Sequence, residues 1–106
     1  MQNKDNEEQI WSDWLDFGDP EIISSTVSDQ AGVFKVHASM KILYIGSSMN
    51  VKQSLLEFMY DPCVGKAKRF SYLITKNHEE VKNQMLIAFR ESHGGKLPSC
   101  MESQQI

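Results

Sequence analysis

The sequence lacks any long apolar stretch, since no hydrophobic run approaches the roughly 18 residues that a membrane-spanning helix needs. The first nine residues, MQNKDNEEQ, place no apolar segment behind a basic start, so we expect no secretory signal. Proline and glycine are also scarce, at three and six residues, which excludes a collagen-like chain. The 106 residues, 41% hydrophobic and 24% charged, are typical of one small domain.

Cysteine is rare as well. Cys63 and Cys100 are the two cysteines, and they do not form a Cys-x-x-Cys pair. A small secreted domain normally carries a denser disulfide framework, so we expect two free thiols in a reducing cytoplasm. A zinc site that combines them with His78 and His93 is disfavoured, because none of these residues has the paired spacing of zinc ligands.

Basic residues are nearly missing from the start of the chain. Residues 1–30, the N-terminal extension, hold one lysine and eight acidic residues, whereas residues 31–106 hold ten basic and six acidic residues. The net charge of −3 therefore conceals a modest positive field over the larger part of the chain. That field permits a nucleic-acid partner without requiring one.

The N-terminal extension is predicted to contain a helix. Apolar residues recur at helical spacing over residues 6–17, and Asp19-Pro20 is expected to prevent the helix from continuing. Trp11 and Trp14 then either anchor a protein partner or a second copy of the chain, or cover the domain's own sheet. Residues 21–30 fit a short strand or a packed loop.

Residues 31–100 have the patterns of a small α/β or α+β domain. Two β-branched and aromatic runs flank residues 38–40, which predicts a β-hairpin. The second run, residues 42–45, is apolar at every position, so we expect a central strand covered on both faces.

Further signals continue the domain toward the C-terminus. Asn50 and Asn77 are typical helix N-caps. Asp61-Pro62 and Gly94-Gly95 mark the ends of the two helices. Three strands in one sheet, packed on helices, are therefore expected, with residues 101–106 as a frayed tail. The predicted elements after the hairpin are a helix from Asn50 to Asp61, a strand over residues 70–75 and a helix from Asn77 to Gly94.

Two short motifs lie on the predicted hairpin strands, and a helix start follows them. The motif positions are Gly32, Val33, Phe34, Tyr44, Ile45, Gly46 and Asn50. With the order hairpin, helix, strand, helix, they resemble the GIY-YIG nuclease family over residues 31–100. The resemblance implies a three-stranded antiparallel sheet flanked by helices, and phosphodiester cleavage aided by Mg²⁺ or Mn²⁺.

The family's catalytic residues are only partly matched. One motif tyrosine is kept as Tyr44, but the other tyrosine position holds Phe34, which has no hydroxyl. The family's arginine, which stabilises phosphate charge, falls at Ser54, and Arg69 is the candidate substitute in space. Losing such a cation costs a factor on the order of 10²–10³ in rate, so the resemblance implies the scaffold without its full chemistry.

The metal ligand implied by the resemblance is displaced too. The family's glutamate falls near Asn83, with Glu79 and Glu80 about one turn earlier, so either glutamate is a candidate ligand for Mg²⁺ or Mn²⁺ if the site is active. A later family asparagine falls near Ser99 or Cys100.

We therefore expect a nucleic-acid-associated domain with weak or lost cleavage and no membrane contact. Two alternatives remain open: an active metal-dependent endonuclease with relocated catalytic residues, and a protein-interaction module that uses the Trp11/Trp14 helix. The candidate contacts to DNA or RNA, which can also be an ordinary solvated surface, are Lys52, Lys66, Lys68, Arg69 and Lys76.

Overall fold

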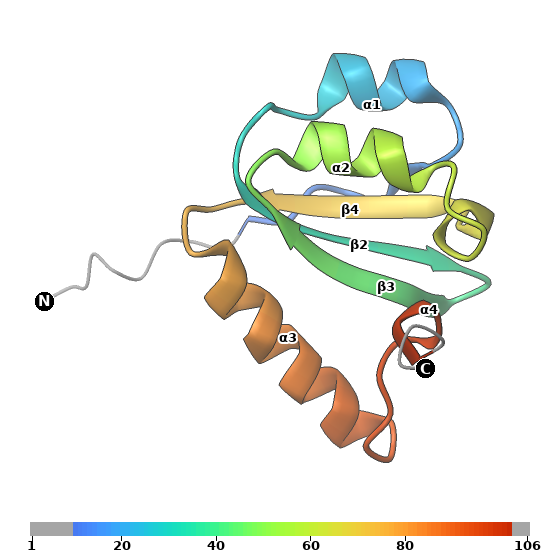
Figure 1. The fold of residues 1–106 in the computed structure, drawn as a ribbon, viewed down its shortest axis with the longest axis vertical. Helices are drawn as coiled ribbons and strands as arrows, with labels where there is room; N and C mark the ends of the chain where they lie inside the picture. Colours follow the sequence, from blue (N-terminus) through green and yellow to red (C-terminus); the bar gives the residue numbers. More distant parts are fainter. Residues whose placement is uncertain (1–9, 103–106) are drawn as a thin grey trace, which may run out of the picture.

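A computed structural model describes residues 10–102, which form one antiparallel sheet with helices on both of its faces (Figure 1). No helix among these residues is long and apolar enough to cross a membrane. In chain order, the elements are β1 (Leu15–Asp16), α1 (Pro20–Thr26), β2 (Gly32–Ala38), β3 (Lys41–Ser48), α2 (Val51–Phe58), the 3-10 helix η1 (Val64–Lys66), β4 (Arg69–Ile74), α3 (His78–Ser92) and α4 (Ser99–Glu102).

The sheet has four strands in the order β1-β4-β2-β3, rather than the three strands predicted. The mixed α/β class is confirmed, and the additional strand is β1, which comes from the N-terminal extension and pairs with β4. The two inner strands are β4 and β2. The apolar strand β3 lies at the sheet edge, so its predicted central place is wrong. Residues 42–45 of this strand are apolar because helices pack on both of its faces, with Tyr44 facing α2 and Ile42 facing α3.

The predicted hairpin is confirmed. Strands β2 and β3 pair antiparallel from Gly32 opposite Ser48 to Ala38 opposite Lys41. The two turn residues, Ser39 and Met40, both have positive φ angles of 54° and 64°. Such a two-residue turn matches the right-handed twist of the flanking strands.

The helix predicted over residues 6–17 is wrong for the part that the structure describes, and residues 6–9 lie outside it. Residues 10–17 run along the sheet, where the Ser12 amide donates to the Tyr72 carbonyl at 2.9 Å. Asp19 and Pro20 begin a helix, α1, instead of ending one, so the short strand or packed loop expected from residue 21 is wrong as far as Thr26. The Asp19 carboxylate accepts a hydrogen bond from the Glu21 amide at 3.0 Å, and proline is well tolerated in the first turn.

The other predicted helices and the third strand are confirmed with small shifts at their ends. The Asn50 side chain accepts a hydrogen bond from the Gln53 amide at 3.0 Å and so caps α2. Strand β4 begins one residue before the predicted Phe70. Helix α3 ends just before Gly94 and Gly95, both of which have positive φ angles.

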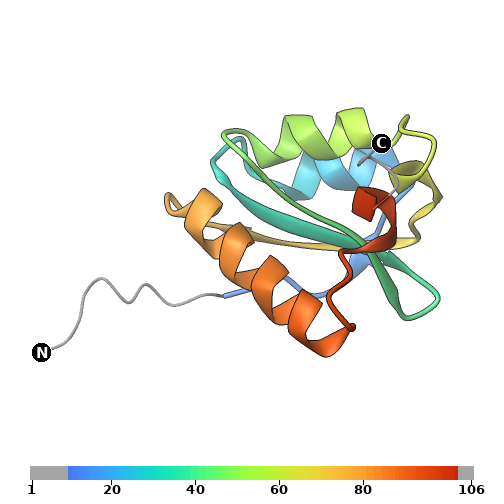
Figure 2. The same cartoon turned by 60° about the horizontal axis from the view of Figure 1, so that its bottom comes forward.

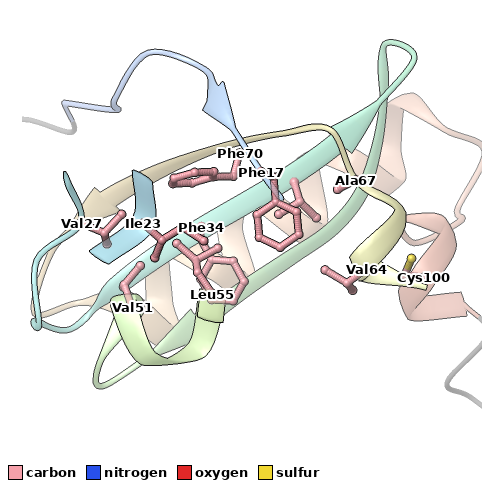
Figure 3. Close-up of a cluster of buried hydrophobic side chains, with 11 residues drawn as sticks. Phe17, Ile23, Val27, Phe34, Val51, Leu55, Val64, Ala67, Phe70 and Cys100 are labelled. Carbon is pink, nitrogen blue, oxygen red and sulfur yellow. The ribbon is translucent and has the colours of Figure 1, made fainter. Parts of the chain in front are cut away.

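Two apolar cores lie on the two faces of the sheet, and Figure 2 shows α1 and α2 on one face and α3 on the other. Side chains of β2 alternate between these cores, as strand geometry requires. The core under α3 consists of Val33, Ile45, Leu73 and Val81. The core under α1 and α2 consists of Phe17, Ile23, Val27, Phe34, Val36, Val51, Leu55, Val64, Ala67, Phe70 and Cys100 (Figure 3).

Cys63 and Cys100 form a disulfide, so the prediction of two free thiols is wrong. The bond joins the loop before η1 to α4, a short helix where a frayed tail was predicted from residue 101. The two Cα atoms lie 5.7 Å apart although 37 residues separate the cysteines. Because that proximity comes from the tertiary fold, no local spacing could reveal it.

Removing the disulfide is expected to lower the free energy of unfolding. Closing a loop of 37 residues restricts the unfolded chain and is worth about 3–4 kcal/mol in the loop-entropy model. Urea unfolding of the wild type should therefore shift to lower urea with a thiol reductant. The double variant Cys63→Ser/Cys100→Ser should match the reduced wild type. A midpoint that reductant leaves unchanged would contradict the pairing.

Candidate functional site

The aromatic residues of the two motifs pack together on the face of the sheet that α2 covers. The Tyr44 ring centroid lies 4.8 Å from that of Phe58 on α2 and 6.1 Å from that of Phe34 on β2. Phe34 is buried, so the position of the missing tyrosine belongs to the core. Tyr44 is half-buried at the margin of the same aromatic cluster.

The two motif glycines allow this close packing. A Cβ atom on Gly46 would lie 2.6 Å from the Tyr44 ring and 2.8 Å from the Phe34 ring. A Cβ atom on Gly32 would collide with the carbonyl oxygen of Leu73 on β4. Both glycines are therefore needed for steric reasons, whatever chemistry the hairpin performs.

The surroundings of Tyr44 keep its hydroxyl protonated. Burial raises the pKa of Tyr44, and the nearby Asp61 carboxylate raises it further. That carboxylate is held in place, because it accepts hydrogen bonds from the amides of Cys63 at 2.9 Å and Val64 at 2.8 Å. A phenol whose pKa lies above 10 is poorly suited to take a proton from water near neutral pH.

Ser54, which stands where the resemblance implies an arginine, has a structural role. Its hydroxyl donates to the hydroxyl of Ser48 at 2.7 Å, and Ser48 in turn accepts a hydrogen bond from the Asn50 amide at 2.9 Å. These contacts connect the end of β3 to the first turn of α2. They leave this position without a positive charge that could bind phosphate.

Arg69, the candidate substitute, lies on the opposite face of the sheet from Tyr44. It is adjacent in β4 to Phe70, whose ring belongs to the core under α1 and α2. Side chains alternate along a strand, so Arg69 points to the other face, where it pairs with Asp16 at 3.3 Å. The two candidate catalytic residues, Tyr44 and Arg69, are therefore not brought together.

The candidate metal ligands also lie on the α3 face. The Glu79 carboxylate accepts a hydrogen bond from Ser47 at 3.0 Å and pairs with Lys82 at 3.4 Å. The Ser47 hydrogen bond, followed by Lys82, lowers the pKa of Glu79. Glu80 follows it on the exposed surface of α3. Across residues 10–102, no three His, Cys, Asp or Glu side chains gather as metal ligands do.

The five candidate nucleic-acid contacts separate toward two ends of the sheet. Lys66, Lys68 and Arg69 lie at the end that holds the β2–β3 turn, since the Lys68 amide donates to the His37 carbonyl at 3.0 Å. Lys52 and Lys76 lie at the other end, beside the start of β2, and Lys52 pairs there with Asp29 at 3.9 Å.

We call the end of the sheet that holds the β2–β3 turn the hairpin end. Lys41 also lies there, together with Lys66, Lys68 and Arg69. It is the first residue of β3, directly after the turn. Sequence reasoning overlooked Lys41, although its place beside a predicted two-residue turn was the signal that could have found it. Lys96, in the segment between α3 and α4, was overlooked because nothing local connects it to the hairpin.

The two tryptophans contact the protein's own sheet. The Lys35 ammonium lies 4.4 Å from the Trp11 ring centroid and 5.3 Å from that of Trp14, and burial lowers the pKa of Lys35. Trp14 also packs edge-on against His37 at 3.9 Å. Of the two readings of these tryptophans, the structure therefore favours cover for the sheet, and the anchor helix that a partner would bind is absent from residues 10–17.

Comparison with protein-family models, curated proteins and solved structures finds no match to the chain.

The raised pKa of Tyr44 predicts a tyrosinate absorbance step above pH 10 in an alkaline titration of the native protein. Because the native pKa exceeds the unfolded value, the neutral phenol stabilises the fold fully below pH 10, and this contribution declines as the pH rises through the native pKa. Tyr44→Phe should remove the step and Asp61→Asn should move it to lower pH. A Tyr44 step at the ordinary pKa would contradict its burial.

Proposed function

We propose that this chain is a GIY-YIG nuclease-like domain that associates with nucleic acid through its hairpin end and has lost efficient phosphodiester cleavage. The observation that carries the proposal is the paired hairpin of β2 and β3. Both motif glycines are there in tight contact, and the motif aromatics pack against α2. An antiparallel sheet with a helix, a strand and a longer helix following the hairpin agrees with the order that the resemblance implies.

The basic side chains at the hairpin end support a nucleic-acid partner. Lys41, Lys66 and Lys68 have no ion-pair partner among residues 10–102, whereas Arg69 and Lys52 are paired with aspartates. Unpaired lysines are available to replace the counterions of a phosphate backbone. Of Lys52 and Lys76, only Lys76 is without an ion pair in the described part of the chain, against three such lysines at the hairpin end, so we assign the main contact to the hairpin end.

Weak or lost cleavage follows from where the candidate catalytic groups lie. Tyr44 has a raised pKa on one face of the sheet, while Arg69 and Glu79 lie on the other. A nuclease needs a cation and a metal ligand within reach of the same phosphate as its activating group. The proposal therefore favours binding over the alternative of an active endonuclease.

Charge reversal at the hairpin end should weaken binding. Lys66→Glu/Lys68→Glu is expected to lower the affinity for a labelled oligonucleotide by at least about tenfold at low salt, and affinity should fall steeply as salt rises. Fluorescence anisotropy measures both effects. Lys52→Glu/Lys76→Glu, which makes the same charge change at the other end, is the matched control and should have a much smaller effect.

Equal losses in the two double variants would mean that net charge alone attracts the nucleic acid. Binding that does not respond to salt, or no binding at low salt, would refute a phosphate contact.

Cleavage is expected to be absent or very slow. Supercoiled plasmid incubated with the purified protein and Mg²⁺ or Mn²⁺ should show no more nicking than with Tyr44→Phe. Nicking by the wild type that Tyr44→Phe, Glu79→Gln or Glu80→Gln abolishes would support an active endonuclease instead. In that case, the separation of these side chains across the sheet would have to change on binding.

A further inference from the structure

A groove lies at the hairpin end, on the face of the sheet opposite Tyr44. Its volume is about 750 Å³, within the range of small-molecule sites. Three elements enclose it: the start of β3, the last turns of α3, and the segment from residue 96 to 102 that includes α4. Figure 1 shows α4 beside the start of β3. We call this hollow the α3–α4 groove.

The floor of the groove is apolar and partly aromatic. Ile42, Phe89 and Leu97 contribute aliphatic and aromatic surface. The His93 ring stacks on the Phe89 ring, with centroids 3.7 Å apart and planes 3° from parallel. Both rings line the groove, so they offer aromatic surface to a planar ligand.

His93 is held in a defined orientation. Its Nδ1 atom lies 2.8 Å from the Phe89 carbonyl oxygen, which can only accept, so Nδ1 carries the proton. Within residues 10–102, Nε2 has no hydrogen-bond partner, and it can accept from a ligand or, when protonated, donate to one.

The rim of the groove is positively charged. Lys41 and Lys96 line it, and neither has an ion-pair partner in the described part of the chain. The lining carboxylate, Glu102, accepts a hydrogen bond from the Leu97 amide at 2.7 Å, so it is engaged in closing the loop that forms the wall. Two lysines over an apolar floor complement a ligand with a planar body and an anionic group.

The groove is also connected to the segment that carries Lys66 and Lys68. Cys100 in α4 is bonded to Cys63, three residues before Lys66, and Ser99 beside it lines the groove. The disulfide therefore holds the segment before Lys66 next to the groove wall.

We propose that the α3–α4 groove binds one unpaired nucleotide of a single strand, with its phosphate between Lys41 and Lys96 and its base on the apolar floor beside His93 and Phe89. That this nucleotide belongs to a nucleic-acid strand rests on the proposed function. The affinity of the groove for a free nucleotide does not depend on it. A base inside a duplex is stacked on both sides and cannot enter such a groove, so the inference predicts a preference for single strands.

The first experiment titrates adenosine 5′-monophosphate into the ¹⁵N-labelled protein and follows amide chemical shifts. The expected shifts are confined to residues around Ile42, Phe89, His93 and Leu97. Adenosine and inorganic phosphate should each bind more weakly than the nucleotide, because adenosine lacks the phosphate and inorganic phosphate lacks the base.

The second experiment repeats the titration with Lys41→Gln/Lys96→Gln, which is expected to lower the nucleotide affinity at least about tenfold, since hydrogen bonds to charged groups are the strong ones. Lys52→Gln/Lys76→Gln makes the same charge change at the other end of the sheet and should leave the affinity unchanged. Anisotropy should also show tighter binding of a single-stranded oligonucleotide than of the matching duplex.

Several results would overturn the inference. Nucleotide shifts outside the groove, equal affinity in the two lysine variants, or a preference for the duplex would each do so. If the amide shifts of the groove residues do not change with nucleotide but change with protein concentration, the groove binds a second copy of this chain instead.

The two proposals can fail separately. Oligonucleotide binding that depends on Lys66 and Lys68, without nucleotide shifts in the groove, would refute the inference and support the proposed function. Nucleotide binding in the groove, without any binding of oligonucleotides, would support the groove's chemistry and refute the proposed function.

Discussion

Pairing of β2 with strands on both sides is the constraint on which the rest of the structure depends. From Gly32 to His37, residues of this strand face partners in β3 and in β4 at the same time. Because the side-chain period of a strand is two, this double pairing fixes which face each neighbouring residue occupies. It sends Phe34 toward α2 and Val33 toward α3, and it places Tyr44 and Arg69 on opposite faces.

The same constraint places on opposite faces of the sheet the candidate catalytic residues that the resemblance would bring together in one site. The face under α2 is filled by the aromatic cluster around Tyr44, whose hydroxyl is kept protonated by burial and by Asp61. The other face holds the Glu79 contact with Ser47 and, at the hairpin end, the α3–α4 groove. The groove that we propose for nucleotide binding therefore lies away from the motif tyrosine, where lysines border apolar surface.

Much of the domain from residue 31 onward was predictable because its signals are local. The turn residues between β2 and β3, the Asn50 cap and the glycines after α3 each act within a few residues. The N-terminal extension was mispredicted because helical spacing of apolar residues competed with pairing to β4. Ser12 and Leu15 pair with the edge of β4, and Lys35 lies against the Trp11 ring. No local pattern encodes these contacts.

By itself, the sequence determined the hairpin, the two longer helices and the strand between them, since propensity, capping and turn geometry act over short separations. It also determined that Ser54 and Phe34 stand where the resemblance implies an arginine and a tyrosine. Only the tertiary structure decided that Cys63 meets Cys100, that Arg69 lies away from Tyr44, and that Lys41 and Lys96 line one groove. These contacts join residues far apart in the chain, so they depend on how the helices pack on the sheet rather than on any local pattern.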